Sequence, residues 1–386
     1  MFLLISPPPT LTPPVLTAPQ PRQVSFGVVS GWVAAATQRV VVVADGHALA
    51  DQPVSSRRMR LVVRLPSRDV TLRVIAIDAA GRHAATSVGP VFGLPPAARP
   101  RAVLSREDPV LERKVRRLAQ GFGGIASVYV EDIATGQGAA WNARARYPAA
   151  STVKLAIAVE TLRRLRGPPP AGSELDTLLR DMLVYSDNDA ANALEVWLGG
   201  SVPGGAEDVN EALETVGLQS TRMYGGFLAD AAGTGVEIPL TLEDEPPFGI
   251  EKYTTAWDLA RLAWWVHLAA AGRGPLVHRL HDFTPGEARF LLFVLAHSAD
   301  HGKLDRYLAS DGVTVLHKAG WITNARHDSG LVYWRGGAFV ATVMTWNPVA
   351  AGVDSDDLAG QVAQAALTRF RALRAERGTT TRSHAA

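Results

Sequence analysis

The chain contains 386 residues, of which 47% are hydrophobic and 20% are charged. At roughly 150 residues per domain, this length is enough for two or three domains with a sizeable core. A formal net charge of +2 provides no strong field that would collect nucleic acid, so we expect no nucleic-acid partner. The absence of cysteine excludes disulfide scaffolds, thiolate metal sites and cysteine nucleophiles. No apolar run reaches the roughly 18 residues of a membrane span.

Residues 1–22 are rich in proline and predict an extended tail or spacer. Seven prolines fall between positions 7 and 21, and such segments are typical of exported or surface-tethered proteins. The apolar run at residues 2–5 is too short for the hydrophobic region of a secretory signal, so no signal peptide is evident. We still expect an extracytoplasmic location, either secreted or on the cell surface.

Residues 23–94 have the pattern of a small β-sandwich. Runs of β-prone residues, separated by turn residues such as Asp45-Gly46, fall at 24–33, 39–43, 60–65, 71–77 and 84–91. Their alternation and their spacing of 8–12 residues predict an immunoglobulin-like all-β domain. This stretch contains no cluster of titratable residues, and we interpret it as a spacer or a binding module.

Residues 95–100 are a linker by composition, and the chain changes character after them. Residues 101–376 predict a helix at 108–121, a hairpin at 126–132 and 138–142, helices from 152 to 297, strands at 313–318, 328–334 and 338–346, and a helix at 358–376. This order predicts an α+β domain in which both ends of the sequence meet in an antiparallel sheet flanked by helices, with an all-helical lobe inserted. Residues 377–386 predict a disordered tail.

Ser151 and Lys154 are the first candidate catalytic pair. The helical pattern that follows them places Ser151 at a helix N-terminus, with Lys154 one turn further on the same face. A serine hydroxyl becomes a good nucleophile only when a base lies within hydrogen-bonding reach. A buried lysine can be that base, because desolvation disfavours its ammonium form. A simple helix cap is the alternative interpretation of Ser151.

Two further clusters occur later in the chain, and the chain has only five lysines. Ser186-Asp187-Asn188 follows a helical stretch, and Lys318-Ala319-Gly320 ends an apolar strand with Trp321 directly after it. Each cluster alone is compatible with an ordinary turn. Together, Ser-x-x-Lys, Ser-Asp-Asn and Lys-x-Gly in this order match the signature of class A β-lactamases and penicillin-binding proteins.

On these motifs, residues 101–374 resemble a class A β-lactamase-like serine hydrolase. The stretch 147–151 resembles the approach to the nucleophile in this family, and 324–330 with 340–345 resembles its last hairpin and strand. The resemblance implies that Ser151 is acylated and that Lys154 is its base. It implies that Ser186 relays a proton to the leaving nitrogen, with help from Lys318. Asn188 is then expected to bind the side-chain amide of the substrate.

The resemblance also implies how the substrate is held. Lys318 attracts its carboxylate, and the substrate lies along the strand that includes Gly320 and Trp321. The backbone N–H groups of Ser151 and Trp321 form the oxyanion hole. The expected substrate is a small β-lactam or a D-alanyl-D-alanine peptide, and no cofactor is implied.

The sequence departs from the family pattern in ways that bear on function. Ala319 stands where the family has threonine or serine, which removes one hydroxyl contact to the substrate carboxylate. The family deacylates with a glutamate on a loop after Ser-Asp-Asn, and residues 223–227 contain no acid. Among the later acids Asp230, Glu237, Glu243, Asp244, Glu245 and Glu251, the Glu245-Pro246 pair is the best match to that loop, with a solvated acidic loop as the alternative.

The leading hypothesis is a serine hydrolase that opens β-lactams through an acyl-enzyme. A D-alanyl-D-alanine carboxypeptidase or penicillin-binding protein is the first alternative, and a non-catalytic surface or wall-binding protein is the second. The histidines lack metalloprotease spacing, so we expect no metal site, and His317 and His327 are predicted to line the cleft. We also expect the protein to be a monomer that associates with the cell wall.

Overall fold

The computed structural model describes residues 10–223, 238, 240–249, 251–308 and 312–383, with side chains up to residue 377. Contacts between residues divide the chain into two compact units, Met1–Pro96 and Ala97–Ala386. The division falls inside the stretch that its composition marks as a linker. None of the described helices is at once long enough and apolar enough to cross a lipid bilayer.

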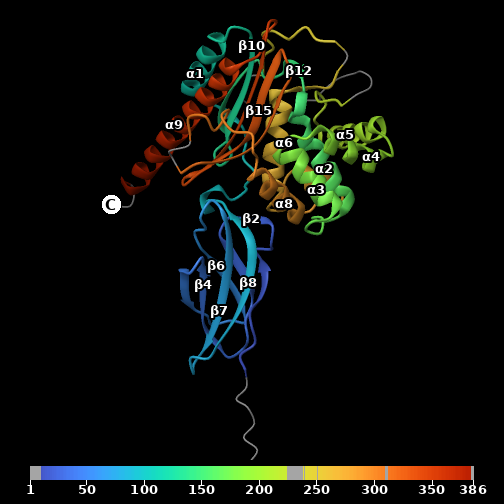
Figure 1. Ribbon diagram of the computed structural model, residues 1–386. Coiled ribbons are helices and arrows are strands. Elements are labelled where there is room, and N and C mark those ends of the chain that lie inside the picture. Colours follow the sequence, from blue (N-terminus) through green and yellow to red (C-terminus); the bar gives the residue numbers. More distant parts are fainter. Residues whose placement is uncertain (1–9, 224–237, 239, 250, 309–311, 384–386) are drawn as a thin grey trace, which may run out of the picture. The chain divides into compact units, whose positions relative to one another are not determined.

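The described part of the first unit is all-β (Figure 1, blue). Its strands are β1 (Val15–Ala18), β2 (Gln23–Ser25), β3 (Val28–Trp32), β4 (Thr37–Ala44), β5 (His47–Pro53), β6 (Arg58–Val62), β7 (Asp69–Asp78) and β8 (His83–Gly93). They form a three-stranded sheet in the order β1-β3-β6 and a five-stranded sheet in the order β2-β8-β7-β4-β5. Alternate residues such as Val42, Leu61 and Leu72 are buried in one shared core, as the period-2 pattern predicts.

The first unit differs from the sequence-based prediction in three places, one of which is β5 at His47–Pro53, where no strand was predicted. The spacer predicted at residues 1–22 is wrong over β1, which pairs antiparallel with β3 because Val15 and Leu16 offer β-prone residues between the prolines. The single run predicted at 24–33 is two strands in different sheets. Gly27 separates them with a φ of +78°, and a Cβ on it would lie 2.0 Å from the carbonyl oxygen of Val63.

The second unit alternates strands and helices in the predicted order. Its elements are the turn η1 (Pro96–Ala98) at its start, β9 (Arg106–Glu107), α1 (Pro109–Gln120), β10 (Ile125–Asp132), β11 (Gln137–Trp141), β12 (Arg146–Pro148), the 3₁₀ turn η2 (Ala150–Val153), α2 (Lys154–Leu165), α3 (Glu174–Val184), α4 (Asn188–Gly199), α5 (Val202–Val216), β13 (Tyr253–Thr255), α6 (Ala256–Ala269), α7 (Pro275–Arg279), α8 (Pro285–Leu295), β14 (Thr314–Trp321), β15 (Ala325–Trp334), β16 (Gly337–Trp346) and α9 (Val353–Ser383).

A six-stranded sheet joins the two ends of this unit, in the order β14-β15-β16-β10-β11-β9. The early strand β10 pairs antiparallel with the late strand β16 from Ile125↔Trp346 to Asp132↔Phe339. The predicted meeting of the sequence ends in an antiparallel sheet is therefore confirmed. Helices α1 and α9 cover one face of this sheet, where Val115, Phe339 and Phe370 are buried together (Figure 1).

Helix α6 packs against the sheet strands β10, β15 and β16 and also contacts α2 and α8 of the helical lobe. Every residue of α6 except Trp265 is buried, so its other aromatic side chains are part of the core. The buried Arg261 donates to Ser105 Oγ (2.9 Å) and Tyr129 Oη (2.8 Å) and lies 3.4 Å from the Glu131 carboxylate. These contacts satisfy a charge that would otherwise be costly to bury.

The disordered tail predicted at residues 377–386 is wrong for most of its length, because α9 continues to Ser383. The residues that lead into this stretch, Arg371-Ala372-Leu373-Arg374, are strong helix formers and no proline follows them. Residues 384–386 lie outside the described part of the chain.

Candidate active site

Ser151 lies in the turn η2 and not in the first turn of an α-helix, because a 3₁₀ turn precedes α2 directly. Strand β12 leads into this turn and pairs with β13, which fixes the chain three residues before the serine. Ala150 has a φ of +47°, a left-handed conformation that is unfavourable for a residue with a Cβ. Such strain is tolerated where the surroundings impose it, and it often marks functional sites.

Lys154 begins α2 and directs its ammonium group at the Ser-Asp-Asn turn. Its Nζ donates to Ser186 O (2.6 Å), Asp187 O (3.1 Å) and Asn188 Oδ1 (2.6 Å). The pKa of Lys154 is lowered from 10.5 to about 8, mainly by burial and also by the charge of Lys252, against the opposing effects of Asp187 and Glu195. A substantial neutral fraction is therefore present at mildly alkaline pH, as a base requires.

Ser186, Asp187 and Asn188 form the connection between α3 and α4. Ser186 has a φ of +60°, and Asp187 caps α4 by accepting a hydrogen bond from Ala190 N (2.7 Å). The ordinary-turn alternative for this cluster is therefore real for Asp187, which caps a helix. It coexists with the functional interpretation, because the cap presents Ser186 and Asn188 toward the two lysines.

Lys318 approaches the same turn from the sheet. Its Nζ donates to Ser186 Oγ (2.9 Å) and to Ala319 O (2.7 Å), and its side chain is buried. The pKa of Lys318 is lowered to about 7, mainly by burial and also by the nearby charge of Lys154. Two lysines with lowered pKa values thus contact Ser186: Lys318 reaches its hydroxyl, which suits a proton transfer, and Lys154 reaches its backbone carbonyl oxygen.

The edge strand β14 lies against η2, the turn that contains Ser151. A Cβ added to Gly320 would lie 2.6 Å from Ser151 N and 2.7 Å from Thr152 N, closer than real Cβ atoms approach. Only glycine at this position therefore lets the strand backbone reach the turn. Among the described strands, β14 has a hydrogen-bonded neighbour, β15, on one side only. Trp321, the next residue, is half exposed beside this contact.

A pocket of about 390 Å³ opens beside Ser151. Its walls come from η2 and α2, from α4, from the end of β14 and from the segment before β13. The lining residues are Ala150, Ser151, Val153, Lys154, Ile157, Asn188, Ala191, Asn192, Glu251, Lys252, Trp321 and Ile322. The structure therefore brings Ser151, Lys154, Asn188 and Trp321 together, and hydrogen bonds and backbone contact tie Ser186, Lys318 and Gly320 to them.

Glu245, the predicted deacylating acid, does not line this pocket. Its carboxylate accepts hydrogen bonds from Arg146 N (2.8 Å) and from the Arg146 guanidinium Nη2 (2.6 Å). Burial alone would raise the pKa of Glu245, but these bonds outweigh it and the pKa is lowered. Arg146 thus holds Glu245 as an ionised anchor of its loop. The alternatives Asp230 and Glu237 lie outside the described residues.

Two other glutamates lie closer to the pocket, and the sequence-based prediction did not single out either of them. Glu251 lines the pocket, and burial raises its pKa. Glu195 is completely buried on α4, and neither of its carboxylate oxygens has a hydrogen-bond partner in the structure. Burial raises the pKa of Glu195, while the charges of Lys252 and Lys154 lower it. Glu195 follows Asn188 by seven residues on α4, and this spacing could have predicted that the two side chains lie on the same face of the helix.

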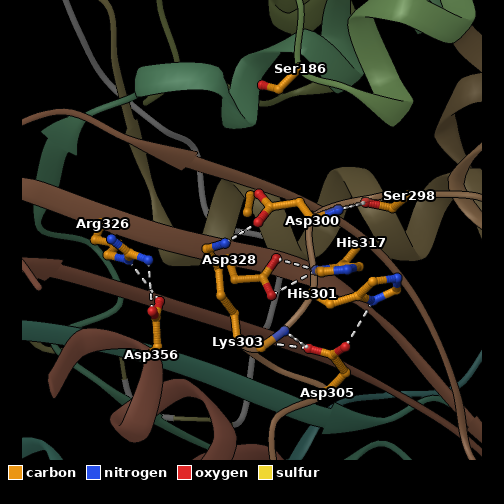
Figure 2. Close-up of polar contacts among 12 residues, drawn as sticks. Ser186, Ser298, Asp300, His301, Lys303, Asp305, His317, Arg326, Asp328 and Asp356 are labelled. Carbon is orange, nitrogen blue, oxygen red and sulfur yellow. Dashed lines mark hydrogen bonds and ion pairs between the residues drawn. The ribbon is translucent and has the colours of Figure 1, made fainter. Parts of the chain in front are cut away.

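A polar cluster lies behind Lys318, and Figure 2 shows how its side chains converge. His317 Nδ1 lies 2.8 Å from the Asp328 carboxylate, which also accepts a bond from Leu304 N (3.1 Å). Lys303 forms an ion pair with Asp300, and Asp305 accepts from Lys303 N (3.0 Å). Within the described ranges, no group of three or more histidine or acidic side chains could hold a metal ion.

The prediction that His317 and His327 line the cleft is wrong, because both are buried and neither lines the pocket. His327 Nδ1 accepts from Thr345 N (3.2 Å), so its Nε2 donates to Pro148 O (2.8 Å). This bridge ties the sheet to β12, the strand that leads to Ser151. Burial lowers the pKa of His327 to about 4, which keeps the ring neutral for this role.

Comparisons with known proteins agree with this geometry. The family model described as the β-lactamase enzyme family matches residues 109–168 and 165–370. The fold is similar to that of PBP-A (22% identity, TM-score 0.54), covering 69% of this chain and 98% of that one. It is also similar to a class A β-lactamase from Mycobacterium abscessus (19% identity, TM-score 0.51), covering 67% of this chain and 99% of that one.

A PBP-A mutant solved as its acyl-enzyme complex with penicillin-G is similar to the same extent, with 21% identity and a TM-score of 0.54, over 69% of this chain and 98% of that one. No curated protein sequence matches the chain significantly. The structural likenesses show the fold, and the family match spans more than half of the chain. Residues 109–370 therefore identify this protein as a member of the β-lactamase enzyme family.

Proposed function

We propose that this protein is a serine hydrolase that opens β-lactams through an acyl-enzyme on Ser151. The observation that carries the proposal is the convergence of two pKa-lowered lysines on the Ser186 turn beside Ser151. The backbone of Gly320 packs against Ser151 N on the other side. A nucleophile, a base, a proton relay and a strand to hold the substrate are thus in one place.

The proposed acylation moves one proton from Ser151 to Lys154 and supplies another to the leaving nitrogen through Ser186, after which the two lysines regain their starting charges by proton exchange with each other or with solvent. Neutral Lys154 accepts the proton of Ser151 Oγ as the oxygen attacks the lactam carbonyl carbon. The C–N bond then breaks, and the leaving nitrogen takes a proton from Ser186 Oγ. Ser186 is restored by a proton from the ammonium group of Lys154 or Lys318, and its contact of 2.9 Å with Lys318 Nζ supports the second source.

Substrate binding is proposed to use groups that the structure leaves available. Asn188 Oδ1 accepts from Lys154, so its Nδ2 can donate to a side-chain amide of the substrate. Lys318 supplies the positive charge for a carboxylate, without a hydroxyl at Ala319 to assist it. The N–H groups of Ser151 and Trp321 are the proposed oxyanion donors, with the substrate lying along the free edge of β14.

Deacylation is the step that separates the two candidate functions. Glu251 lines the pocket with a raised pKa, which favours turnover with Glu251 as the base that activates water. Arg146 holds Glu245 away from this role, and that observation favours the alternative of a D-alanyl-D-alanine carboxypeptidase or penicillin-binding protein. In such a protein the penicilloyl adduct persists because no base activates water.

The experiment that tests acylation follows the intact mass of the full chain over time after mixing with penicillin-G. We expect an adduct of one penicillin on the wild-type chain and none on Ser151→Ala. An adduct that forms and clears while hydrolysed penicillin accumulates supports β-lactam hydrolysis. A lasting adduct supports the penicillin-binding alternative, and no adduct on the wild type rejects both in favour of a non-catalytic protein.

A matched pair of variants then tests the deacylating acid. Glu251→Gln is expected to slow clearance of the adduct by about 100-fold, the lower range for loss of a general base. Glu245→Gln removes the same charge outside the pocket and should leave clearance unchanged. Slow clearance in Glu245→Gln alone would restore Glu245 as the base. Clearance at the wild-type rate in both variants would exclude both glutamates.

The proposal extends to the setting of the enzyme. The proline-rich start and the all-β first unit support an extracytoplasmic, monomeric protein whose first unit is immunoglobulin-like and associates with the cell wall. Cell fractionation and sedimentation of the full chain test location and oligomeric state. Recovery in the cytoplasmic fraction, or sedimentation as a dimer, would reject the corresponding part.

A further inference from the structure

The first unit carries most of its charge as arginine. Residues 1–96 contain nine arginines and four aspartates, with no lysine or glutamate, which gives a net charge of +5. The whole chain has a net charge of only +2, so residues 97–386 carry −3. The positive charge of the protein is therefore concentrated in its smaller, all-β unit.

Part of this charge lies on one face of the three-stranded sheet. In and just after β6, Arg58, Arg60, Val62 and Arg64 are exposed and alternate with the buried residues Met59, Leu61 and Val63, so Val62 lies between Arg60 and Arg64 on this face. Alternate residues of a strand point to the same face at intervals of about 7 Å. The three arginines therefore form a row along an edge strand of the sheet.

No acid competes for this row. Strands β1, β3 and β6 contain no aspartate or glutamate. Among the described residues, Arg58, Arg60 and Arg64 form no ion pair, whereas Arg39, Arg68 and Arg82 of the same unit pair with Asp51, Asp45 and Asp78. Three unpaired guanidinium groups on one face are a recognition surface for planar anions such as carboxylates and sulfates.

The neighbouring strands add groups that suit a sugar. Trp32 lies opposite Arg58 in the pairing of β3 with β6, is 51% exposed, and has the Arg58 guanidinium 5.9 Å from its ring centre. Ser30 lies opposite Arg60, and its hydroxyl is 3.0 Å from that of Thr17 on β1. An aromatic ring, paired hydroxyls and arginines thus lie in adjacent rows of one face.

We propose that this face, formed by Trp32, Ser30, Arg58, Arg60 and Arg64, binds a linear anionic polysaccharide. The row of arginines fits repeated carboxylates or sulfates along a chain, the tryptophan offers a flat apolar surface to a sugar ring, and the hydroxyls offer neutral hydrogen bonds. A single exposed aromatic ring is fewer than a single-stranded nucleic-acid groove uses, since such grooves stack successive bases. The face lies in the first unit and does not depend on the proposed catalytic function.

The test measures binding of the full-length protein to polygalacturonate by isothermal titration calorimetry at 50 mM and 300 mM NaCl. Binding should weaken at the higher salt, because the contacts are exposed ion pairs. The variant Arg58→Gln with Arg60→Gln should lose about tenfold in affinity, and Trp32→Ala should lose affinity at both salt concentrations. The matched control Arg39→Gln with Arg73→Gln removes the same two charges from exposed positions of the five-stranded sheet and should bind as the wild type.

Several outcomes would overturn the proposal. One is no binding of the wild type to polygalacturonate at 50 mM NaCl. Another is an equal loss in the control variant, which would indicate attraction by net charge alone. Tighter binding to single-stranded DNA, or to vesicles that contain anionic lipid, would assign the face to those partners. Circular dichroism of each variant confirms that a loss of binding is not a loss of fold.

Discussion

The charge of Lys154, which lines the pocket, disfavours the charged form of Lys318, which contacts Ser186. Lys154 has a pKa of about 8 and Lys318 of about 7, and each is lowered by burial. The proposed reaction needs Lys154 neutral and Lys318 charged. Acylation should therefore rise as Lys154 loses its proton and fall as Lys318 does, which gives a bell-shaped profile centred between the two values. Because the two groups interact, the two limbs report the pair and not single residues.

Glu195 adjusts the rising limb of that profile. Its buried carboxylate raises the pKa of Lys154, against the effect of Lys252, while Asp187 also raises it. We predict that Glu195→Gln lowers the pKa of Lys154 and raises the acylation rate on the acidic side of the profile. The measurement is the rate of adduct formation with penicillin-G between pH 5 and 10. The variant should also melt no earlier than the wild type, because it removes a buried carboxylate that has no hydrogen-bond partner.

A control keeps this prediction specific to the pocket. Glu211→Gln removes an exposed carboxylate from the adjacent helix α5 and should leave the profile in place. An unchanged profile in Glu195→Gln, in a protein that still forms the Ser151 adduct, would show that Glu195 does not act on Lys154. A wild type without any adduct would instead reject the proposed function.

At the scale of elements, the contact between β14 and η2 depends on the absence of a side chain at Gly320. We predict that Gly320→Ala slows acylation by about 100-fold, because the new Cβ must push the strand away from Ser151 N and such misplacement disrupts the reacting geometry. Stability should fall by about 1–3 kcal/mol, as expected for overpacking. Stopped-flow acylation and urea unfolding measure the two effects.

The matched control for this variant is Gly123→Ala, where a Cβ meets nothing within 4 Å and φ is not positive. It should leave both the acylation rate and the unfolding midpoint unchanged. If Gly320→Ala were acylated at the wild-type rate, the backbone of β14 would take no part in positioning Ser151.

The ion pair between His317 on β14 and Asp328 on β15 should make the stability of the fold depend on pH. Burial by itself lowers the pKa of His317, but the Asp328 carboxylate outweighs it, with Asp305 and Asp300 further off, and the pKa is raised. A raised pKa stabilises the fold below about 6.5, the ordinary value of histidine, and this contribution is lost as pH rises through the folded-state value. The charged groups that face the ring are thus Asp328, Asp305 and Asp300.

We therefore predict that the melting temperature of the wild type falls between pH 6 and pH 9 by more than that of His317→Gln. At pH 6 the variant should be about 3 kcal/mol less stable, because it leaves the buried Asp328 without its partner. Calorimetry across this pH range measures both. Parallel curves for the two proteins would show that the ring is neutral in the fold.

At the scale of the whole molecule, local patterns predicted the elements and missed what depends on packing. The apolar periodicity of residues 109–120 and the turn residues at 134–136 are local signals, and α1 and the hairpin β10–β11 were predicted from such signals. The strand β1 and the break at Gly27 depend on partners distant in sequence, β3 and Val63. Periodicity alone does not contain those contacts.

The same division applies to the site. Ser151, Lys154, Ser186, Asn188, Lys318, Gly320 and Trp321 were predicted from three short motifs, and the structure brings them together. The role of the acidic side chains was not predicted correctly, because a carboxylate on a loop can face either a pocket or an arginine. Arg146 and Glu245 are 99 residues apart in sequence, and only the pairing of β12 with β13 shows that Arg146 lies within reach.

The division of the chain into two units leads to a prediction for its unfolding. Each unit has its own hydrophobic core, and the cut between Pro96 and Ala97 precedes β9, which pairs with β11 inside the second unit. A fragment of residues 97–386 should therefore fold cooperatively and form the Ser151 adduct at the rate of the full chain. Calorimetry of the full chain should then show a second transition that the fragment lacks. A fragment that fails to fold would mean that the second unit needs contacts from the first, and the full chain would then unfold in one transition.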